Sequence, residues 1–265
     1  MSNLVKRILT GFVYVTVILF ALTNANYIGP LFLIVAIVGT FELKKMCEAQ
    51  FMEFDLYPTI GIGSVCYASI LYPKLIALVH ISIFIYFISE LYRTKKTLQN
   101  IGSSLLSIVY IYMPLALIIP IGSHSGVYEY KLLFGLLILI WSSDTWAFVV
   151  GRTIGKRKLF ERLSPNKTWE GFWGSVILTG LTGYVLSKSG FGLNSKEWFM
   201  LGGVTVFIAT VGDLFQSMLK RASKIKDSGT ILPGHGGVLD RFDSILFCMP
   251  AYYIYFYHLR PLLTT

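Results

Sequence analysis

Charged residues are scarce in this sequence. Asp, Glu, Lys and Arg make up 14% of its 265 residues, against about 25% in an average soluble domain. Hydrophobic residues make up 54%, above the roughly 45–50% that is usual. This balance excludes an ordinary soluble domain and predicts an integral membrane protein, whose organisation has to be read as a series of membrane spans.

Cysteine is also scarce, and its placement excludes two further classes of protein. The three cysteines, Cys47, Cys66 and Cys248, are far apart in the sequence. Their odd number and wide spacing fit neither a disulfide framework nor a zinc site. The sequence likewise lacks internal repeats, low-complexity tracts and any segment typical of a soluble domain.

A basic domain with interleaved aromatic residues is missing too, although the formal net charge is +9. The basic residues lie in short loops between apolar runs, where they serve to orient a membrane protein. We therefore expect no nucleic-acid partner.

Nine apolar stretches approach the length of about 20 residues that a spanning helix needs. The sequence thus predicts an all-α polytopic bundle of about nine transmembrane helices. They cover residues 8–24, 27–42, 56–73, 75–92, 101–122, 130–151, 171–187, 197–219 and 238–259. The first could be a signal peptide, with a weak cleavage site at Thr23-Asn24-Ala25, but the many later spans favour an uncleaved anchor.

The distribution of Lys and Arg orients these spans. With the N-terminus inside, the inner segments hold 17 Lys and Arg residues and the outer segments hold 5. The positive-inside rule then places the N-terminus inside, the C-terminus outside, and the basic loops 152–170 and 220–237 in the cytoplasm. We divide the chain into an N-terminal group of spans, 1–100, and a C-terminal region, 101–265, which carries nearly all of the unusual polar residues.

Four aspartates lie near the inner ends of spans. Asp144 and Asp213 share a depth of roughly 10–12 Å from the cytoplasmic boundary, at 1.5 Å per helical residue, and such acids are costly unless paired or bound to a metal. Asp240 and Asp243 begin the ninth span on one helix face. Clustered carboxylates with few histidines indicate Mg²⁺. The alternative, that Asp240 and Asp243 merely cap their helix, does not explain the other two.

The turn Pro233-Gly234-His235-Gly236-Gly237 immediately precedes the ninth span. Its backbone N–H groups and the following helix N-terminus could form a phosphate-binding nest. The glycines could equally serve a chain that must re-enter the membrane. His235 could contact a phosphate or a leaving group. The alternative is that it is a hydrogen-bonded residue of the turn.

Several cytoplasmic cations are candidates for binding a polyphosphate. Lys167, in the compact segment 164–171, is the first of them. The others are Lys220, Arg221, Lys226 and Arg241. For each, a solvated or headgroup-facing cation is the alternative.

Two acids, Glu42 and Glu90, fall at the inner ends of predicted spans. An acid in that place can extend to the water–lipid interface. We therefore interpret both as snorkelling side chains without a role in chemistry.

The segment after span eight resembles the signature of a known family. It comprises Ser217-Met218-Leu219-Lys220-Arg221, Lys226-Asp227, Leu232-Pro233, His235-Gly236-Gly237 and Asp240-Arg241-Phe242-Asp243. Together these resemble the phosphatidate cytidylyltransferases, also called CDP-diacylglycerol synthases. Parts of 143–171 resemble the family as well, with Asn166 where many relatives carry lysine. The resemblance is specific over about 140–245 and only topological before that.

The resemblance implies transfer of a cytidylyl group from CTP to phosphatidate in a reaction that depends on Mg²⁺. The identity of any second cation stays open. It implies that Asp213 and Asp240 bind the metal and that Asp243 and Asp144 complete the shell. The implied catalytic residues are Lys167, Lys226, Arg241 and His235, and the implied nucleotide contacts are Ser217, Lys220, Arg221, Gly236 and Gly237.

The resemblance also implies where the partners come from. Phosphatidate would enter from the inner leaflet of the bacterial cytoplasmic membrane, and CTP from the cytoplasm. The N-terminal spans would then form a lipid entrance or the interface of a homodimer.

Two other functions stay open. A related nucleotidyl or phosphoryl transferase could act on a polyprenyl or ether-lipid substrate. An ion-coupled transporter would also place acids in spans, but inverted repeats and broken midplane helices, which favour transport, are not visible. The CDP-alcohol phosphotransferases fit less well because their paired-aspartate motif has a different spacing.

Overall fold

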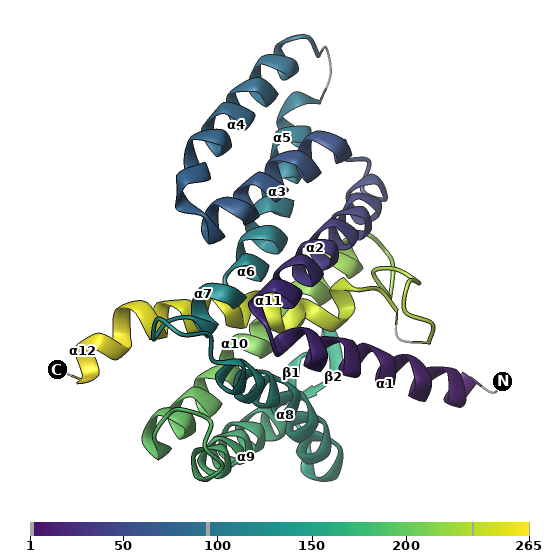
Figure 1. The fold of residues 1–265 in the computed structure, drawn as a ribbon. Helices are drawn as coiled ribbons and strands as arrows, with labels where there is room; N and C mark the ends of the chain where they lie inside the picture. Colours follow the sequence, from purple (N-terminus) through teal and green to yellow (C-terminus); the bar gives the residue numbers. More distant parts are fainter. Residues whose placement is uncertain (1–2, 94–95, 235, 265) are drawn as a thin grey trace. The chain divides into compact units, whose positions relative to one another are not determined.

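A computed structural model describes residues 3–93, 96–234 and 236–264 (Figure 1). These residues form α-helices, short 3-10 and π segments and one two-stranded hairpin, so the predicted all-α class is confirmed for them. The chain divides into two compact units, Met1–Pro120 with Leu219–Phe242, and Ile121–Met218 with Asp243–Thr265.

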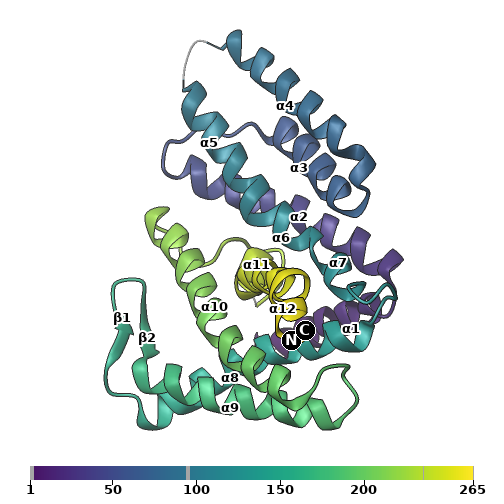
Figure 2. The same ribbon diagram turned by 90° about the vertical axis from the view of Figure 1, so that its left-hand side faces the viewer.

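The first unit contains the N-terminal helices. They are α1 (Asn3–Leu22), α2 (Ala25–Glu48), α3 (Leu56–Leu71), α4 (Ile76–Leu91), α5 (Thr97–Ser107) and α6 (Met113–Ala116), with a 3-10 turn at Pro73–Leu75 and a π segment at Ile108–Tyr112. Asn24 caps α2 by accepting a hydrogen bond from the Asn26 N–H at 2.9 Å. The α3, α4 and α5 helices lie side by side (Figures 1 and 2).

The second unit is built around α8 (Tyr130–Ile154) and α9 (Trp169–Lys188), which pack along their lengths (Figure 2). Their contact uses small residues, as is common between membrane helices. The Ser175 hydroxyl donates to the Ser143 carbonyl at 2.7 Å, and a Cβ at Gly171 would lie 2.7 Å from the Ala147 carbonyl oxygen.

A hairpin connects these two helices. Strands β1 (Lys158–Phe160) and β2 (Ser164–Thr168) pair antiparallel, with Lys158 opposite Thr168. Thr168 then caps α9 by accepting a hydrogen bond from the Gly171 N–H at 3.2 Å. The predicted basic loop 152–170 is therefore an ordered hairpin anchored at the start of α9.

The remaining elements complete the C-terminal part. They are α7 (Ile118–Gly122), α10 (Ser195–Ala222), α11 (Leu239–Ile254), a π segment at Tyr255–Leu259 and α12 (Arg260–Thr264). The division between the two units falls within α7, α10 and α11.

Each of the nine predicted spans contains a helix in the part of the chain that the structure describes. Five helical stretches there are long and apolar enough to cross a membrane, and they cover Ala25–Glu48, Pro73–Leu91, Thr97–Gly122, Tyr130–Ile154 and Ser195–Ala222. Ile8–Leu22 and Leu56–Leu71 are shorter apolar helices. These helices fit a membrane protein.

Candidate active site

The β1–β2 hairpin carries a lysine that pairs with an acid of α10 within the second unit. The Lys167 ammonium lies 2.5 Å from Asp213 Oδ2. The Ser217 hydroxyl, one turn further along α10, donates to Asp213 Oδ1 at 3.4 Å. Three residues that the sequence singled out for catalysis, metal binding and nucleotide binding thus lie together.

This pair is open to solvent. The Lys167 side chain is 22% exposed and the Asp213 side chain 28% exposed. An accessible ammonium and carboxylate can each exchange their mutual contact for a ligand, because neither is sealed from water.

The backbone around Asp213 packs closely on α11. A Cβ at Gly212 would lie 2.6 Å from the Asp243 carbonyl oxygen, so only a glycine lets the two helices approach this far. Asp144 and Asp243 both lie within electrostatic reach of the Cys248 thiol. These contacts bring the backbone beside Asp213 close to the backbone of Asp243. A site shared by Asp144, Asp213 and Asp243 stays a prediction.

A metal cluster is a separate matter. Among the described residues, no group of three or more His, Cys, Asp or Glu side chains is placed to hold a metal ion. Mg²⁺ in phosphoryl-transfer sites is commonly held by one or two carboxylates together with substrate phosphates and water, so the donor chemistry of Asp213 fits that ion. The assignment of all four aspartates to one metal stays a prediction.

The second lysine–aspartate pair belongs to the first unit. The Lys220 ammonium lies 2.7 Å from Asp240 Oδ1. Asp240 Oδ2 accepts hydrogen bonds from the Ser228 N–H at 2.7 Å, the Gly237 N–H at 3.0 Å and the Ser228 hydroxyl at 3.0 Å. Both oxygens of Asp240 are thus engaged by groups of the protein.

The segment between α10 and α11, described at residues 223–234 and 236–238, contacts Asp240 through Ser228 and Gly237. We call it the Asp240 loop. It also receives Glu42 from α2, which sequence reasoning assigned no role. The Glu42 carboxylate accepts hydrogen bonds from the Ser228 hydroxyl at 2.6 Å, the Val238 N–H at 2.8 Å and the Leu239 N–H at 2.9 Å.

The snorkelling interpretation of Glu42 and Glu90 is wrong. The two residues are 1% and 4% exposed, because each is held by internal donors instead of reaching the interface. Glu90 pairs with Arg93 Nε at 2.8 Å and accepts a hydrogen bond from the Asn100 amide at 2.8 Å. A carboxylate inside an apolar run is itself a sign of a functional or structural partner, and this sign could have identified Glu42.

The glycine turn binds carboxylates of the chain itself. The Gly237, Val238 and Leu239 N–H groups, which the sequence offered to a phosphate, donate to Asp240 and Glu42. Gly236 has φ +88°, a conformation that favours glycine, and its carbonyl accepts from the Leu232 N–H at 3.1 Å. The phosphate nest remains a prediction, and His235 lies outside the described residues.

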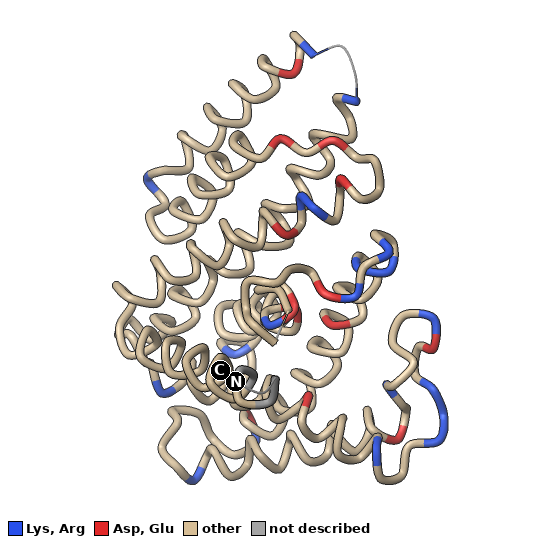
Figure 3. The backbone as a smooth tube through the Cα atoms, turned by 90° about the vertical axis from the view of Figure 1, so that its right-hand side faces the viewer, with Lys and Arg blue, Asp and Glu red and all other residues tan. Residues whose placement is uncertain are grey.

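The other predicted cations lie on the surface of the described residues. Lys226 and Arg241 are exposed, and Arg221 Nη1 donates to the Ile225 carbonyl at 3.3 Å, where it closes the end of α10. Lys and Arg gather at helix ends and in connecting loops, including the β1–β2 hairpin (Figure 3).

Glu170 fixes the base of that hairpin. Its carboxylate accepts hydrogen bonds from the Lys156 N–H at 2.9 Å and the Arg157 N–H at 3.1 Å. These donors stabilise the charged carboxylate and so lower the pKa of Glu170 below its ordinary value. The Lys156 N–H has the largest effect.

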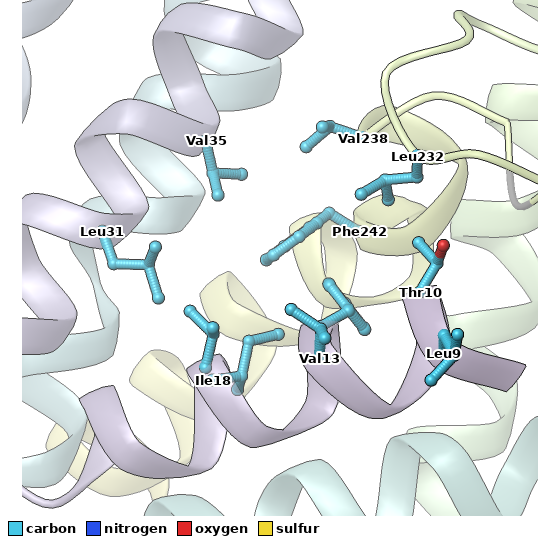
Figure 4. Close-up of a pocket in the computed structure, with 11 residues that line it drawn as sticks. Leu9, Thr10, Val13, Ile18, Leu31, Val35, Leu232, Val238 and Phe242 are labelled. Atoms are coloured by element: carbon cyan, nitrogen blue, oxygen red, sulfur yellow. The ribbon is translucent and has the colours of Figure 1, made fainter. Parts of the chain in front are cut away.

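An apolar pocket of about 450 Å³ lies beside the Asp240 loop in the first unit (Figure 4). Side chains of α1 and α2 form one part of its wall, and Leu232, Val238 and Phe242 form the other. The same loop therefore presents apolar side chains to the pocket and backbone donors to Glu42.

Comparisons with known proteins show which family the chain resembles. A family model described as "Cytidylyltransferase family" matches residues 5–259. The chain is 32% identical over 271 residues to a phosphatidate cytidylyltransferase of Bacillus subtilis, covering 96% of this chain and 97% of the relative. A protein of the same name from Staphylococcus epidermidis is 31% identical, over 92% of this chain and 95% of the relative.

A third relative matches over a shorter part. The phosphatidate cytidylyltransferase of Haemophilus influenzae is 38% identical over 141 residues, which are 51% of this chain and 49% of the relative. The family resemblance read from the sequence is thereby confirmed, and the chain belongs to the cytidylyltransferase family.

Proposed function

We propose that this chain transfers the cytidylyl group of CTP to phosphatidate, giving CDP-diacylglycerol and pyrophosphate. The observation that carries the proposal is the match, along nearly the whole chain, to relatives that bear the name phosphatidate cytidylyltransferase. The partly exposed pair of Lys167 and Asp213 supports it, because a reaction between two phosphate groups needs a cation whose charge can be released to a substrate.

In this reaction a phosphate oxygen of phosphatidate attacks the α-phosphorus of CTP. The new P–O bond forms as the bond to the β-phosphate breaks, and pyrophosphate leaves with the electron pair. The nucleophile is already an anion, so the site does not need a strong general base. The work of the protein is to align two anions and to neutralise charge as it shifts to the leaving group.

Lys167 is the residue that we assign first to the triphosphate. It is accessible and its carboxylate partner is accessible, so its ammonium can turn from Asp213 to a phosphate oxygen. Lys226 and Arg241 are exposed cations of the Asp240 loop and of α11, and we assign them to the same anion. Ser217 and Arg221 would complete the nucleotide contacts from α10.

We further propose that Mg²⁺ binds with the nucleotide, and that Asp213 is its main protein ligand. The ion would supply positive charge to the phosphates of CTP. Asp240, Asp243 and Asp144 remain the other predicted ligands. Asp240 would have to give up part of its present set of donors to serve as one.

The lipid would bind through the apolar pocket beside the Asp240 loop. Its volume of about 450 Å³ and its almost wholly hydrocarbon lining suit an acyl chain (Figure 4). We propose that phosphatidate enters it from the inner leaflet of a bacterial cytoplasmic membrane, with nine spans, the N-terminus inside and CTP arriving from the cytoplasm. A homodimer is also proposed, and cross-linking in membranes would test it.

The direct test is turnover of radiolabelled CTP with phosphatidate by the purified protein in lipid nanodiscs. We expect Mg²⁺-dependent release of pyrophosphate and formation of CDP-diacylglycerol, with a loss in Asp213→Asn and Asp240→Asn and not in Glu48→Gln, an exposed acid at the end of α2. Near-wild-type rates in both aspartate variants would remove the metal assignment. A panel with polyprenyl phosphate, an ether lipid, ATP and dCTP separates the alternative substrates, and activity only on one of those would overturn the proposed substrate pair.

A further inference from the structure

The carboxylate of Glu42, on the last turns of α2, is buried against the Asp240 loop without being part of the predicted site. We propose that Glu42 is a positioning residue for cytidylyl transfer, which holds the Asp240 loop in the shape that brings Lys220 and Asp240 together. This inference rests on the proposed function, but the role of Glu42 in ordering the loop can be measured without substrate.

The first argument is the number and type of its partners. Glu42 accepts hydrogen bonds from two consecutive backbone N–H groups, at Val238 and Leu239, and from the Ser228 hydroxyl. The backbone donors stand at the N-terminus of α11, a helix of 16 residues, where the helix dipole favours a negative charge. An ionised carboxylate in a buried place needs such a set of donors.

The second argument is that Glu42 and Asp240 share a donor. The Ser228 hydroxyl lies 2.6 Å from Glu42 Oε2 and 3.0 Å from Asp240 Oδ2, while the Ser228 N–H binds Asp240 at 2.7 Å. Ser228 therefore connects the buried acid of α2 to the acid that pairs with Lys220. A change in Glu42 can therefore reach Asp240 through Ser228, in addition to its contacts with the Val238 and Leu239 N–H groups.

The third argument comes from the glycines of the loop. A Cβ at Gly229 would lie 2.5 Å from Glu42 Oε1, and a Cβ at Gly237 would lie 2.6 Å from the same atom and also collide with the Ser228 hydroxyl. Neither glycine has a positive φ, so conformational freedom does not explain them. The close approach of Glu42 does. Of the two, Gly237 belongs to the turn that the sequence offered to a phosphate.

The fourth argument is that α2 holds both ends of the loop. At the start of the loop, the Ser223 hydroxyl donates to the Met46 carbonyl at 2.8 Å, and the Gln50 amide donates to Ser223 Oγ at 3.2 Å. At its end, Glu42 binds Val238 and Leu239. Lys220 precedes the first anchor and Asp240 follows the second, so the ends of the loop set the distance of that ion pair.

The test uses Glu42→Gln, Glu42→Asp and Glu42→Ala, with Glu48→Gln as the matched control on the same helix. Glutamine turns one donor toward a backbone N–H, so we expect kcat/KM to fall roughly 10- to 100-fold, with the change mainly in kcat at saturating CTP and phosphatidate. Aspartate keeps the charge and should recover part of the rate. A merely structural role would leave kcat unchanged in protein that stays folded.

A double-mutant cycle sharpens the result. If Glu42 acts through Ser228, the loss in Glu42→Gln combined with Ser228→Ala should be close to the larger single loss and not the product of both. Multiplying losses would contradict the proposed route. A wild-type kcat/KM in folded Glu42→Gln would overturn the positioning role itself.

Amide hydrogen exchange tests the role of Glu42 in the loop without substrate, and so independently of the proposed function. The Val238 and Leu239 amides should exchange at least about tenfold faster in Glu42→Gln than in the wild type or in Glu48→Gln, because their acceptor is weakened. If the wild-type protein turned over no CTP with phosphatidate while this protection behaved as expected, the proposed function would fail and the loop anchor would stand. Unchanged exchange would remove the anchor.

Discussion

The two lysine–aspartate pairs of this protein have the same chemistry and different surroundings. The side chains of Lys167 and Asp213 are 22% and 28% exposed. Asp213 accepts one further hydrogen bond, from the Ser217 hydroxyl. The pair of Lys220 and Asp240 is 13% and 6% exposed, and Asp240 accepts three more hydrogen bonds. An open pair can release its charges to a ligand, whereas a saturated pair holds a loop in place.

The largest expected effect removes the cation of the open pair. Lys167→Ala should lower kcat/KM by roughly 10²–10³-fold, the range for losing one group that stabilises developing charge. Thermal stability should change little, because a partly exposed ion pair contributes at most about 1 kcal/mol. Steady-state kinetics and melting in detergent measure both. Lys158→Ala, an exposed lysine of the same hairpin, is the control, and equal losses in the two variants would contradict a special role for Lys167.

The saturated pair should respond in the opposite way. Asp240→Asn leaves the largely buried Lys220 without a counter-charge, which costs about 3–5 kcal/mol in buried pairs, so the melting temperature should fall markedly. Adding Lys220→Met should restore part of the stability and none of the activity. If Asp240→Asn instead melted like the wild type, the contrast between the two pairs would be lost.

The smallest expected effect concerns the hairpin that carries Lys167. The pKa of Glu170 is lower in the folded protein than the ordinary value of 4.5. The stability that its carboxylate gives to the hairpin is therefore fully present above pH 4.5 and is lost as the pH falls through the folded pKa. Protection of the Lys156 and Arg157 amides, corrected for intrinsic exchange, should be constant from neutral pH to about pH 5 and then fall. Glu170→Gln should remove this pH dependence; a decline starting above pH 6 would contradict the assignment.

The helices could be predicted from the sequence because hydropathy is a local property. Each predicted span contains a helix among the described residues. Asp213 was singled out from its depth, Lys167 from its place in a basic loop, and Ser217 from the family resemblance. Their pairing was not predictable, since it depends on how β2 meets α10. The π segments at Ile108–Tyr112 and Tyr255–Leu259 leave no sign in the pattern either.

Glu42 shows where such an interpretation fails. Its position at the end of an apolar run fits a side chain that reaches water, and nothing in the linear sequence reveals that residues 228 and 237–239 bury it. The glycines at 229 and 237 were visible, but their cause is a carboxylate about 190 positions earlier. A contact across such a separation needs the folded chain.

Val238 faces two environments at once. Its side chain lines the apolar pocket, and its amide N–H binds Glu42 (Figure 4). If a molecule binds the pocket with higher affinity when the Val238 N–H is bound to Glu42, its binding must favour that hydrogen bond by the same factor. Thermodynamic linkage requires this reciprocity. An acyl chain in the pocket would then slow hydrogen exchange at the Val238 amide, and loss of the Glu42 contact would weaken its binding.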